Sequence, residues 1–210
     1  MSAMLILQCA MLFVAAPLAA LGYAVPRRSV DVLVLAYVSL VVMIARRRVT
    51  AIVAIAGSAC GLASTTWSLM DSPGALTFVL HIGTLIGVAF SGGIVARALF
   101  APGPVTIHRV IGAVVLYLIA ALGFSMAYRL IGDFVPDAFA GVTIDADSLR
   151  SMVSMIYFSF VALTSTGFGD IVPVHPIARS VANLEAVIGQ LYPATLVAVL
   201  VSQHLETRRR

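Results

Sequence analysis

Long apolar runs, separated by short breaks that carry arginine, constrain this chain more than any other feature. Of its 210 residues, 61% are hydrophobic and only 10% are charged, and the mean hydropathy is +1.06. A soluble domain carries about a quarter charged residues, so this composition excludes an ordinary water-soluble core. A helix needs about 20 apolar residues to cross the hydrocarbon core of a bilayer. The sequence therefore predicts an all-α membrane protein.

Six of the apolar runs are expected to be transmembrane helices. They occupy residues 4–24, 32–45, 49–70, 75–95, 110–131 and 178–201. A seventh apolar stretch, residues 151–164, is too short to span the bilayer comfortably. Such a segment is tolerated at membrane depth only where it is buried in protein or lines water. It is therefore expected to be a re-entrant helix.

The basic residues indicate how such a bundle is oriented. The chain has no lysine, and its arginines lie mainly between apolar runs and at the C-terminal end, which favours topology signals over a nucleic-acid surface. Threading six spans places Arg46 to Arg48, Arg97, Arg109 and Arg208 to Arg210 on one side. The positive-inside rule puts that side, and both termini, in the cytoplasm of a cell-membrane protein. A cleaved signal peptide over residues 1–24 is the alternative, and it would leave five spans.

One octet, LTSTGFGD at residues 163–170, suits neither a helix nor lipid contact. Gly167 and Gly169 allow backbone angles that other residues resist, so that successive carbonyl groups can point the same way. Carbonyl oxygens lining a narrow passage can replace the water shell of a monovalent cation. The short helix before the octet would direct the negative end of its dipole toward the middle of the bilayer. One chain supplies one side of such a ring, so a homotetramer is expected.

The residues around the octet resemble the pore loop of the potassium channel superfamily, whose filter commonly reads T-V-G-Y-G-D. YFSFVAL precedes TSTGFGD here and IVPVHPIAR follows it, and the likeness covers residues 110–203. The resemblance implies an outer helix, a pore helix, a filter and an inner helix, with permeant potassium ions at residues 165–168 and no other cofactor. It assigns to the filter region Thr164, which closes the pore helix, and then Ser165, Thr166, Gly167, Phe168 and Gly169.

Three filter residues depart from the common pattern of that family. Ser165 replaces a threonine and offers its hydroxyl on a side chain that is not β-branched. Thr166 stands where valine or isoleucine is usual, and its side chain is expected to point behind the filter. Phe168 replaces a tyrosine whose hydroxyl normally braces the filter. The sequence predicts a passive potassium-selective channel, and a weakly selective potassium/sodium channel is the alternative.

Four further residues are assigned to filter support. Tyr157 and Phe158 match the aromatic cuff around the filter, although interfacial or core packing explains such aromatic residues equally well. Asp170 is expected just outside the filter, within reach of the Tyr157 hydroxyl. Val161 stands where some relatives have a buried carboxylate. Glu185, an acid inside the sixth span, is therefore expected to brace the pore helix, and a snorkelling side chain or a neutral acid with satisfied hydrogen bonds is the alternative.

Two residues of the sixth span are candidates for a gating hinge. Gly189 and Pro193 can each loosen or bend a helix. Inner helices of the superfamily commonly bend at a glycine at this depth, so Gly189 is the first candidate. Its alternative role is that of a small residue for close helix packing.

The chain divides into two expected parts and a tail. Residues 1–100 are expected to form a four-helix bundle, residues 105–205 the pore module, and residues 206–210 a basic cytoplasmic tail, which leaves no room for a soluble regulatory domain. The fourth run carries only Arg97, whereas a voltage sensor needs several arginines along one span. An acidic loop over residues 133–147 is expected to concentrate cations at the pore mouth. No enzyme motif stands out, and an ion-coupled transporter is the more distant alternative.

Overall fold

The computed structural model describes residues 2–15, 75–100, 106–143 and 149–208, together with isolated positions between 17 and 63. The spans expected at residues 32–45 and 49–70 fall outside this described part, apart from those isolated positions. The part of the chain that the structure describes is almost entirely helical, as the sequence predicts.

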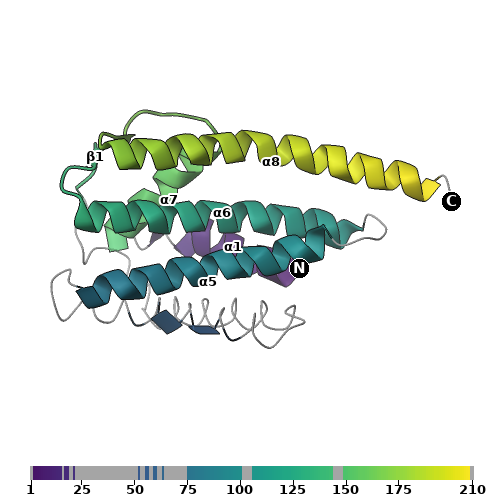
Figure 1. Cartoon of the computed structure of the whole chain (residues 1–210), viewed down its shortest axis with the longest axis horizontal. Helices are drawn as coiled ribbons and strands as arrows, with labels where there is room; N and C mark the ends of the chain where they lie inside the picture. Colours follow the sequence, from purple (N-terminus) through teal and green to yellow (C-terminus); the bar gives the residue numbers. More distant parts are fainter. Residues whose placement is uncertain are drawn as a thin grey trace.

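The described elements follow one another as helices with one short two-stranded ladder. In chain order they are α1 (Ser2–Ala10), the π-helix η1 (Met11–Ala15), α5 (Ala75–Leu99), α6 (Ile107–Phe134), β1 (Phe139–Ala140), α7 (Leu149–Leu163), β2 (Val172–Pro173) and α8 (Pro176–Arg208). The long helices α5, α6 and α8 lie lengthwise beside one another, and the short helix α7 lies at the end near β1 (Figure 1). Helix α7 packs against both α6 and α8.

Two of the described helices are long and apolar enough to cross a membrane. They are the segments Phe78–Leu99 and Ile107–Phe134. The second has 28 residues, a length of about 42 Å at 1.5 Å per residue, which exceeds the hydrocarbon core of about 30 Å. It ends where Pro136 follows the C-cap Val135, because the residue before a proline is driven out of the helical region. The all-helical membrane fold is thus confirmed at this coarser level, and the count of six spans stays a prediction.

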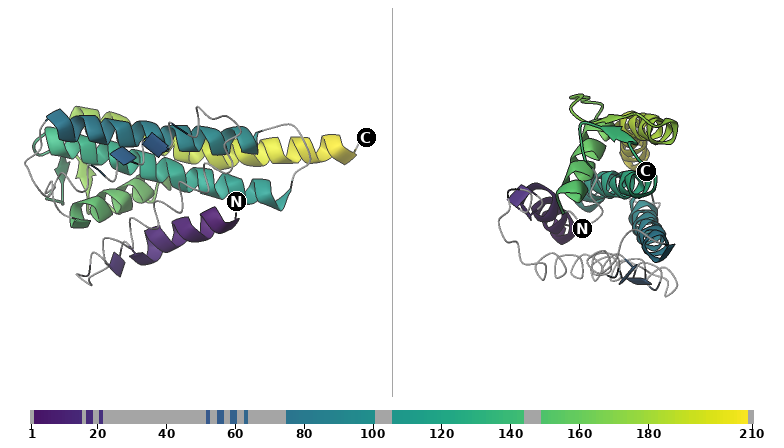
Figure 2. Two further views of the ribbon diagram at one scale, coloured as in Figure 1. Left: turned by 90° about the horizontal axis from the view of Figure 1, so that it is seen from below. Right: turned by 90° about the vertical axis from the view of Figure 1, so that its left-hand side faces the viewer.

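The N-terminal helix packs onto the helices of the predicted pore module. Met4 of α1 belongs to a buried cluster with Val95 of α5 and Val115 of α6. Leu12 of η1 packs with Leu118 of α6 and with Ile156 of α7. Figure 2 shows α1 beside α6 and α7 in both of its views. The first residues of the chain therefore contact the outer helix and the predicted pore helix directly.

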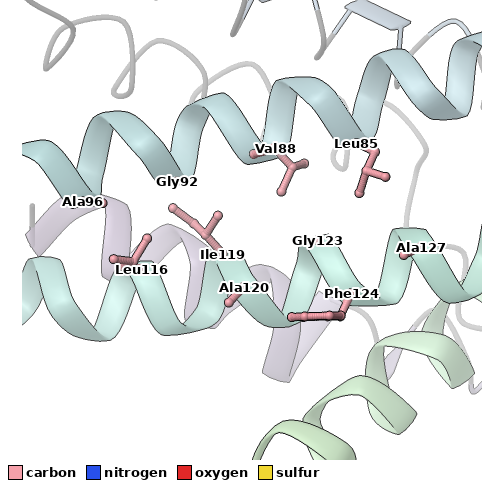
Figure 3. Close-up of a pocket in the computed structure, with 11 residues that line it drawn as sticks. Leu85, Val88, Gly92, Ala96, Leu116, Ile119, Ala120, Gly123, Phe124 and Ala127 are labelled. Carbon is pink, nitrogen blue, oxygen red and sulfur yellow. The ribbon is translucent and has the colours of Figure 1, made fainter. Parts of the chain in front are cut away.

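An apolar groove separates α5 from α6 over several turns. Its volume is about 400 Å³, and small residues lie opposite larger aliphatic ones along it, with Gly92 of α5 facing Ile119 and Gly123 of α6 facing Val88 (Figure 3). Its lining residues carry no ionisable side chain. The groove therefore offers no chemistry of its own, and the apolar cluster around Val95 and Val115 holds α5 and α6 together.

The acidic loop begins later in the chain than the sequence suggests. Asp133 lies inside α6, and its side chain is only 2% exposed, 3.8 Å from Arg129 Nε and 3.8 Å from His81 Nε2. The expectation that Asp133 belongs to a solvated acidic loop is therefore wrong. The side chain instead joins the outer helix to α5, because a buried carboxylate needs cationic or hydrogen-bonding neighbours.

Candidate functional site

Helix α7 is too short to cross a membrane. Its 15 residues are about 22 Å long, less than the hydrocarbon core of about 30 Å. It ends at Leu163, and residues 164–170 that follow it are all exposed in the single chain. The octet singled out in the sequence is thus an exposed segment at the C-terminal end of a short apolar helix.

The end of α7 is a Schellman motif, which fixes where the octet leaves the helix. The Thr166 N–H donates to the Val161 carbonyl at 2.9 Å, and the Ser165 N–H donates to the Ala162 carbonyl at 3.0 Å. Ser165 has φ +54°, the left-handed conformation that this motif requires after the cap. Glycine is usual at that position. Ser165 adopts this positive φ against a steric cost, which the surrounding structure must offset.

The backbone of the octet alternates in the sign of φ. Ser165, Gly167 and Gly169 have φ values of +54°, +63° and +79°, whereas Thr166 and Phe168 are not in the positive region. An alternation of this kind turns successive carbonyl groups toward one side of the chain, and glycine reaches positive φ without steric cost. A row of carbonyl oxygens of this form can replace the hydration shell of a monovalent cation.

The carbonyl groups of the last turn of α7 all accept hydrogen bonds. Phe160 O accepts from the Thr164 N–H at 3.0 Å and from the Thr164 hydroxyl at 2.7 Å. The Schellman bonds satisfy the next two carbonyls, and Leu163 O accepts from the Tyr117 hydroxyl of α6 at 3.2 Å. The helix end therefore does not present bare carbonyls, although each oxygen keeps a second lone pair.

Two threonine hydroxyls connect the octet back to α7. Thr164 Oγ1 lies 2.8 Å from Thr166 Oγ1. The single proton of Thr164 points to Phe160 O, so Thr166 is the donor in the contact between the two hydroxyls. The Thr166 side chain therefore lies on the α7 side of the octet.

The supporting aromatic residues of α7 separate into two environments. The ring of Tyr157 is stacked on Phe168 of the octet, with centroids 6.3 Å apart and planes 3° apart. Phe158 points instead into a buried cluster, 4.8 Å from the ring of Tyr128 and 5.6 Å from that of Phe139. Adjacent helical residues face different directions. Of these two aromatic residues, Tyr157 contacts the octet and Phe158 does not.

Asp170 lies next to the Tyr157 hydroxyl. Desolvation raises the pKa of the Tyr157 phenol above its ordinary value, and Asp170 raises it further through a side-chain hydrogen bond and through its charge. The phenol therefore keeps its proton and remains a donor to the carboxylate. This contact joins the exit of the octet to the middle of α7.

The segment after the octet is fixed against the linker that follows α6. Strands β1 and β2 pair antiparallel, with Phe139 opposite Pro173. Gly141 has φ +84°, and a Cβ there would lie 1.8 Å from the Asp170 carbonyl oxygen, so only glycine fits. The Arg179 Nε–H of α8 donates to the Pro173 carbonyl at 3.0 Å. The segment that leaves the octet, here called its exit, is therefore held both by the linker after α6 and by α8.

Glu185 lies at the junction of three helices and is fully buried. The Tyr128 hydroxyl of α6 donates to Glu185 Oε2 at 2.5 Å, and Ser159 Oγ of α7 lies 2.5 Å from Glu185 Oε1. Ser159 Oγ also lies 2.7 Å from the carbonyl oxygen of Ala121 in α6. The carboxyl group thus links the inner helix to both the outer helix and α7.

Gly189 is the point of closest approach between α8 and α7. A Cβ at this position would lie 1.8 Å from the carbonyl oxygen of Leu163. Helix α8 runs without interruption from residue 176 to 208 and contains Pro193. The structure therefore gives Gly189 a packing role, and a hinge at Gly189 or Pro193 stays a prediction.

Sequence reasoning did not single out Tyr128, Ser159, Tyr117 or Gly141. The first three are polar residues inside apolar helices, and this was the available signal, because a polar group in such a helix needs a partner. Gly141 is an isolated glycine in a loop, and only its positive φ and its neighbour Asp170 reveal its role.

Within the described residues, no group of three His, Cys, Asp or Glu side chains could hold a metal ion. The oxygen atoms that the octet offers are those of its backbone carbonyl groups and of the Thr164, Ser165 and Thr166 hydroxyl groups. These are the ligands that hard monovalent and divalent cations accept when they lose water.

Comparison with known proteins agrees with this geometry. Residues 112–205 match a protein family described as "Ion channel". The chain is 30% identical over 97 residues to the inward rectifier potassium channel Kirbac3.1 of Paramagnetospirillum magnetotacticum, a match that covers 46% of this chain and 29% of the relative. It is 31% identical over 86 residues to protein LctB of Bacillus caldotenax, covering 39% of this chain and 61% of that protein. No solved structure matches this chain.

The matched segment contains α6, α7, the octet and α8 almost completely. The match of residues 112–205 to an ion channel family confirms the resemblance drawn from the octet at the level of an ion channel pore. In length, the chain spans less than two thirds of each of these two relatives.

Proposed function

We propose that this chain is a subunit of a homotetrameric channel that conducts potassium ions passively through the backbone carbonyls of residues 165–169. The observation that carries the proposal is the alternation in the sign of φ at Ser165, Gly167 and Gly169, directly after the Schellman end of α7. The name of one relative, an inward rectifier potassium channel, supports the choice of ion. The coordinating atoms are the carbonyl oxygens of Ser165 to Phe168, to which Ser165 adds a hydroxyl.

The exposure of the octet in a single chain supports assembly of four copies. Phe168 is 67% exposed, and one chain can line only one side of an ion. Helix α8 also presents apolar side chains that this chain does not cover, among them Leu184 and Leu191, which are 55% and 58% exposed. Neighbouring subunits would cover part of this surface, and lipid the remainder.

A multi-pass topology with both termini in the cytoplasm follows from the arginine distribution. In this proposal the described helices α5 and α6 are two of the six spans, and α8, with 33 residues, is the inner one. Residues 1–100 would then form a peripheral bundle around residues 105–205. The contact of α1 and η1 with α6 and α7 supports a direct mechanical connection between the two parts.

The weakly selective potassium/sodium channel remains the second candidate for one specific reason. Phe168 contacts α7 by ring stacking on Tyr157 and has no hydroxyl for a hydrogen bond. Stacking restrains a ring less directionally than a hydrogen bond does. The Thr166–Thr164 contact and the Tyr157–Asp170 contact are polar restraints on the octet, and they favour the selective pore.

The reversal potential of the purified protein in a planar bilayer, with potassium on one side and sodium on the other, tests both candidates. A value near the potassium equilibrium potential supports the selective channel. A value near zero with robust current leaves a non-selective cation channel. Gly167→Ala is the matched loss-of-function variant, because alanine resists φ +63°, and Gly93→Ala is its control, because open space surrounds Gly93. Equal currents from wild type and Gly167→Ala would contradict conduction through the octet.

A further inference from the structure

Glu185 has a buried carboxyl group that ion conduction does not use. It is 0% exposed and belongs to α8, whereas its hydrogen-bond partners belong to α6 and α7. An ionised carboxylate in such a place is costly unless it is paired. In the part of the chain that the structure describes, no arginine or histidine forms an ion pair with it.

The number of protons available around Ser159 indicates the protonation state of Glu185. Ser159 Oγ lies within hydrogen-bonding distance of two oxygens, Ala121 O at 2.7 Å and Glu185 Oε1 at 2.5 Å. A serine hydroxyl has one proton to donate. The Ala121 carbonyl is an acceptor only, so it takes the serine proton. The contact with Glu185 Oε1 then needs a proton of its own, and the carboxyl group can supply it.

The other carboxyl oxygen fits the same arrangement. Glu185 Oε2 accepts from the Tyr128 hydroxyl, which lies 2.5 Å away. All polar atoms are then satisfied in one directed chain, from Tyr128 to Glu185, from Glu185 to Ser159, and from Ser159 to the Ala121 carbonyl. If the acid were ionised, two oxygens of this chain would face each other without a proton between them.

We propose that Glu185 is a neutral carboxylic acid that donates its proton to Ser159 and so ties α6, α7 and α8 together behind the octet. Removal of that proton at alkaline pH breaks the contact with Ser159 or with Ala121 and leaves a buried charge. Ser159 lies one turn before the end of α7, so the helix that carries the octet is loosened. The effect on ion flux rests on the proposed function, but the protonation state does not.

Among the residues that the structure describes, few titratable groups face this acid. From α6 they are Tyr128 and Tyr117, the latter within electrostatic reach. Arg129 of the same helix lies beside Asp133, 3.8 Å away. From α7 the facing group is Ser159, while Tyr157 of that helix contacts Phe168 and Asp170 instead. Strand β2 contributes Val172 and Pro173, which do not titrate.

Infrared spectroscopy of the full chain in lipid tests the protonation state directly. At about pH 6, ordinary carboxyl groups with pKa values near 4 are ionised, so the carbonyl band of a protonated acid reports an exceptional one. We expect this band in wild type, its loss in Glu185→Gln, and its retention in Glu206→Gln, which changes the other glutamate of the chain. Spectra in which Glu185→Gln matches wild type would overturn the proposal.

Potassium flux from neutral pH to about pH 9, below the range of ordinary tyrosine titration, tests the consequence. We expect a decrease of about fivefold in wild type, equivalent to the loss of one buried hydrogen bond. Glu185→Gln keeps a donor for Ser159 and an acceptor for Tyr128 and has no proton to lose, so its flux should stay constant over this pH range. An alkaline decrease that persists in Glu185→Gln would overturn the link to gating. If no variant conducts, the proposed function fails, and the infrared band alone decides the state of Glu185.

Discussion

The backbone of Gly189 in α8 lies directly against the carbonyl oxygen of Leu163, the last residue of α7. A Cβ at position 189 would stand 1.8 Å from that oxygen and 2.7 Å from the carbonyl carbon. Both atoms belong to the backbone and have no side-chain rotation with which to give way. The inner helix can therefore approach the end of α7 this closely only where it has no side chain.

Gly189→Ala should accordingly separate α8 from α7. Alanine normally stabilises a helix relative to glycine by about 0.5–1 kcal/mol, but overpacking here should cost about 1–3 kcal/mol. We expect a lower midpoint of thermal unfolding in detergent and a loss of potassium flux. Gly93→Ala in α5, where open space surrounds the glycine, is the control and should be neutral or stabilising. A stabilised, conducting Gly189→Ala protein would refute the packing constraint.

The local pattern of the sequence was sufficient to predict the helices around the site. The expected spans at residues 75–95, 110–131 and 178–201 correspond to α5, α6 and α8, and the short run at 151–164 corresponds to α7. Each helix extends beyond its apolar run at one end or at both, because a helix continues through polar residues until a proline, a cap or a loop ends it. The apolar composition and the length of each run were enough, because these are properties of neighbouring residues.

The contacts between helices could not be predicted from the local pattern of the sequence. Tyr128 and Glu185 are 57 positions apart, and Ser159 and Ala121 are 38 apart, so no spacing rule brings them together. Asp133 looked like a loop acid because a break in hydropathy precedes the end of α6. Its burial depends on Arg129 and His81, and the latter belongs to another helix. Glu185 was singled out only because an acid inside an apolar run is costly to bury and therefore indicates a specific role.

Thr166→Val should weaken the attachment of the octet to the end of α7. The variant removes the hydroxyl that donates to Thr164 Oγ1 at 2.8 Å, a contact worth about 1 kcal/mol, or about fivefold in an equilibrium. Because Phe168 has no hydroxyl to compensate, we expect a comparable rise in sodium permeability relative to potassium, measured from the reversal potential. The control is Thr195→Val, whose hydroxyl bonds only to carbonyls of its own helix. Unchanged selectivity in Thr166→Val would show that the threonine contact does not hold the octet.

Tyr128→Phe should destabilise the three-helix junction more than Tyr192→Phe does. Tyr128 donates to a buried carboxyl oxygen at 2.5 Å, whereas Tyr192 donates to the Ala113 carbonyl at 2.8 Å. Leaving a buried acceptor of a carboxyl group without its donor costs about 1–3 kcal/mol. The measurement is thermal unfolding of both variants in the same detergent. Combining Tyr128→Phe with Glu185→Leu should cost less than the sum of the two single changes, since partners in contact are not additive; additive effects would contradict a direct bond.

Gly141→Ala should disturb the exit of the octet while leaving the helices intact. The glycine has φ +84°, and an added Cβ would lie 1.8 Å from the Asp170 carbonyl oxygen, so the linker after β1 must move away from the octet. Asp170 is also the residue that contacts the Tyr157 hydroxyl, and its displacement removes that restraint as well. We expect unchanged helix content by circular dichroism together with a reversal potential shifted toward zero. Ala140→Ser, an exposed change at the adjacent position, should leave both readouts as in wild type. Full selectivity in Gly141→Ala would mean that the linker does not position the octet.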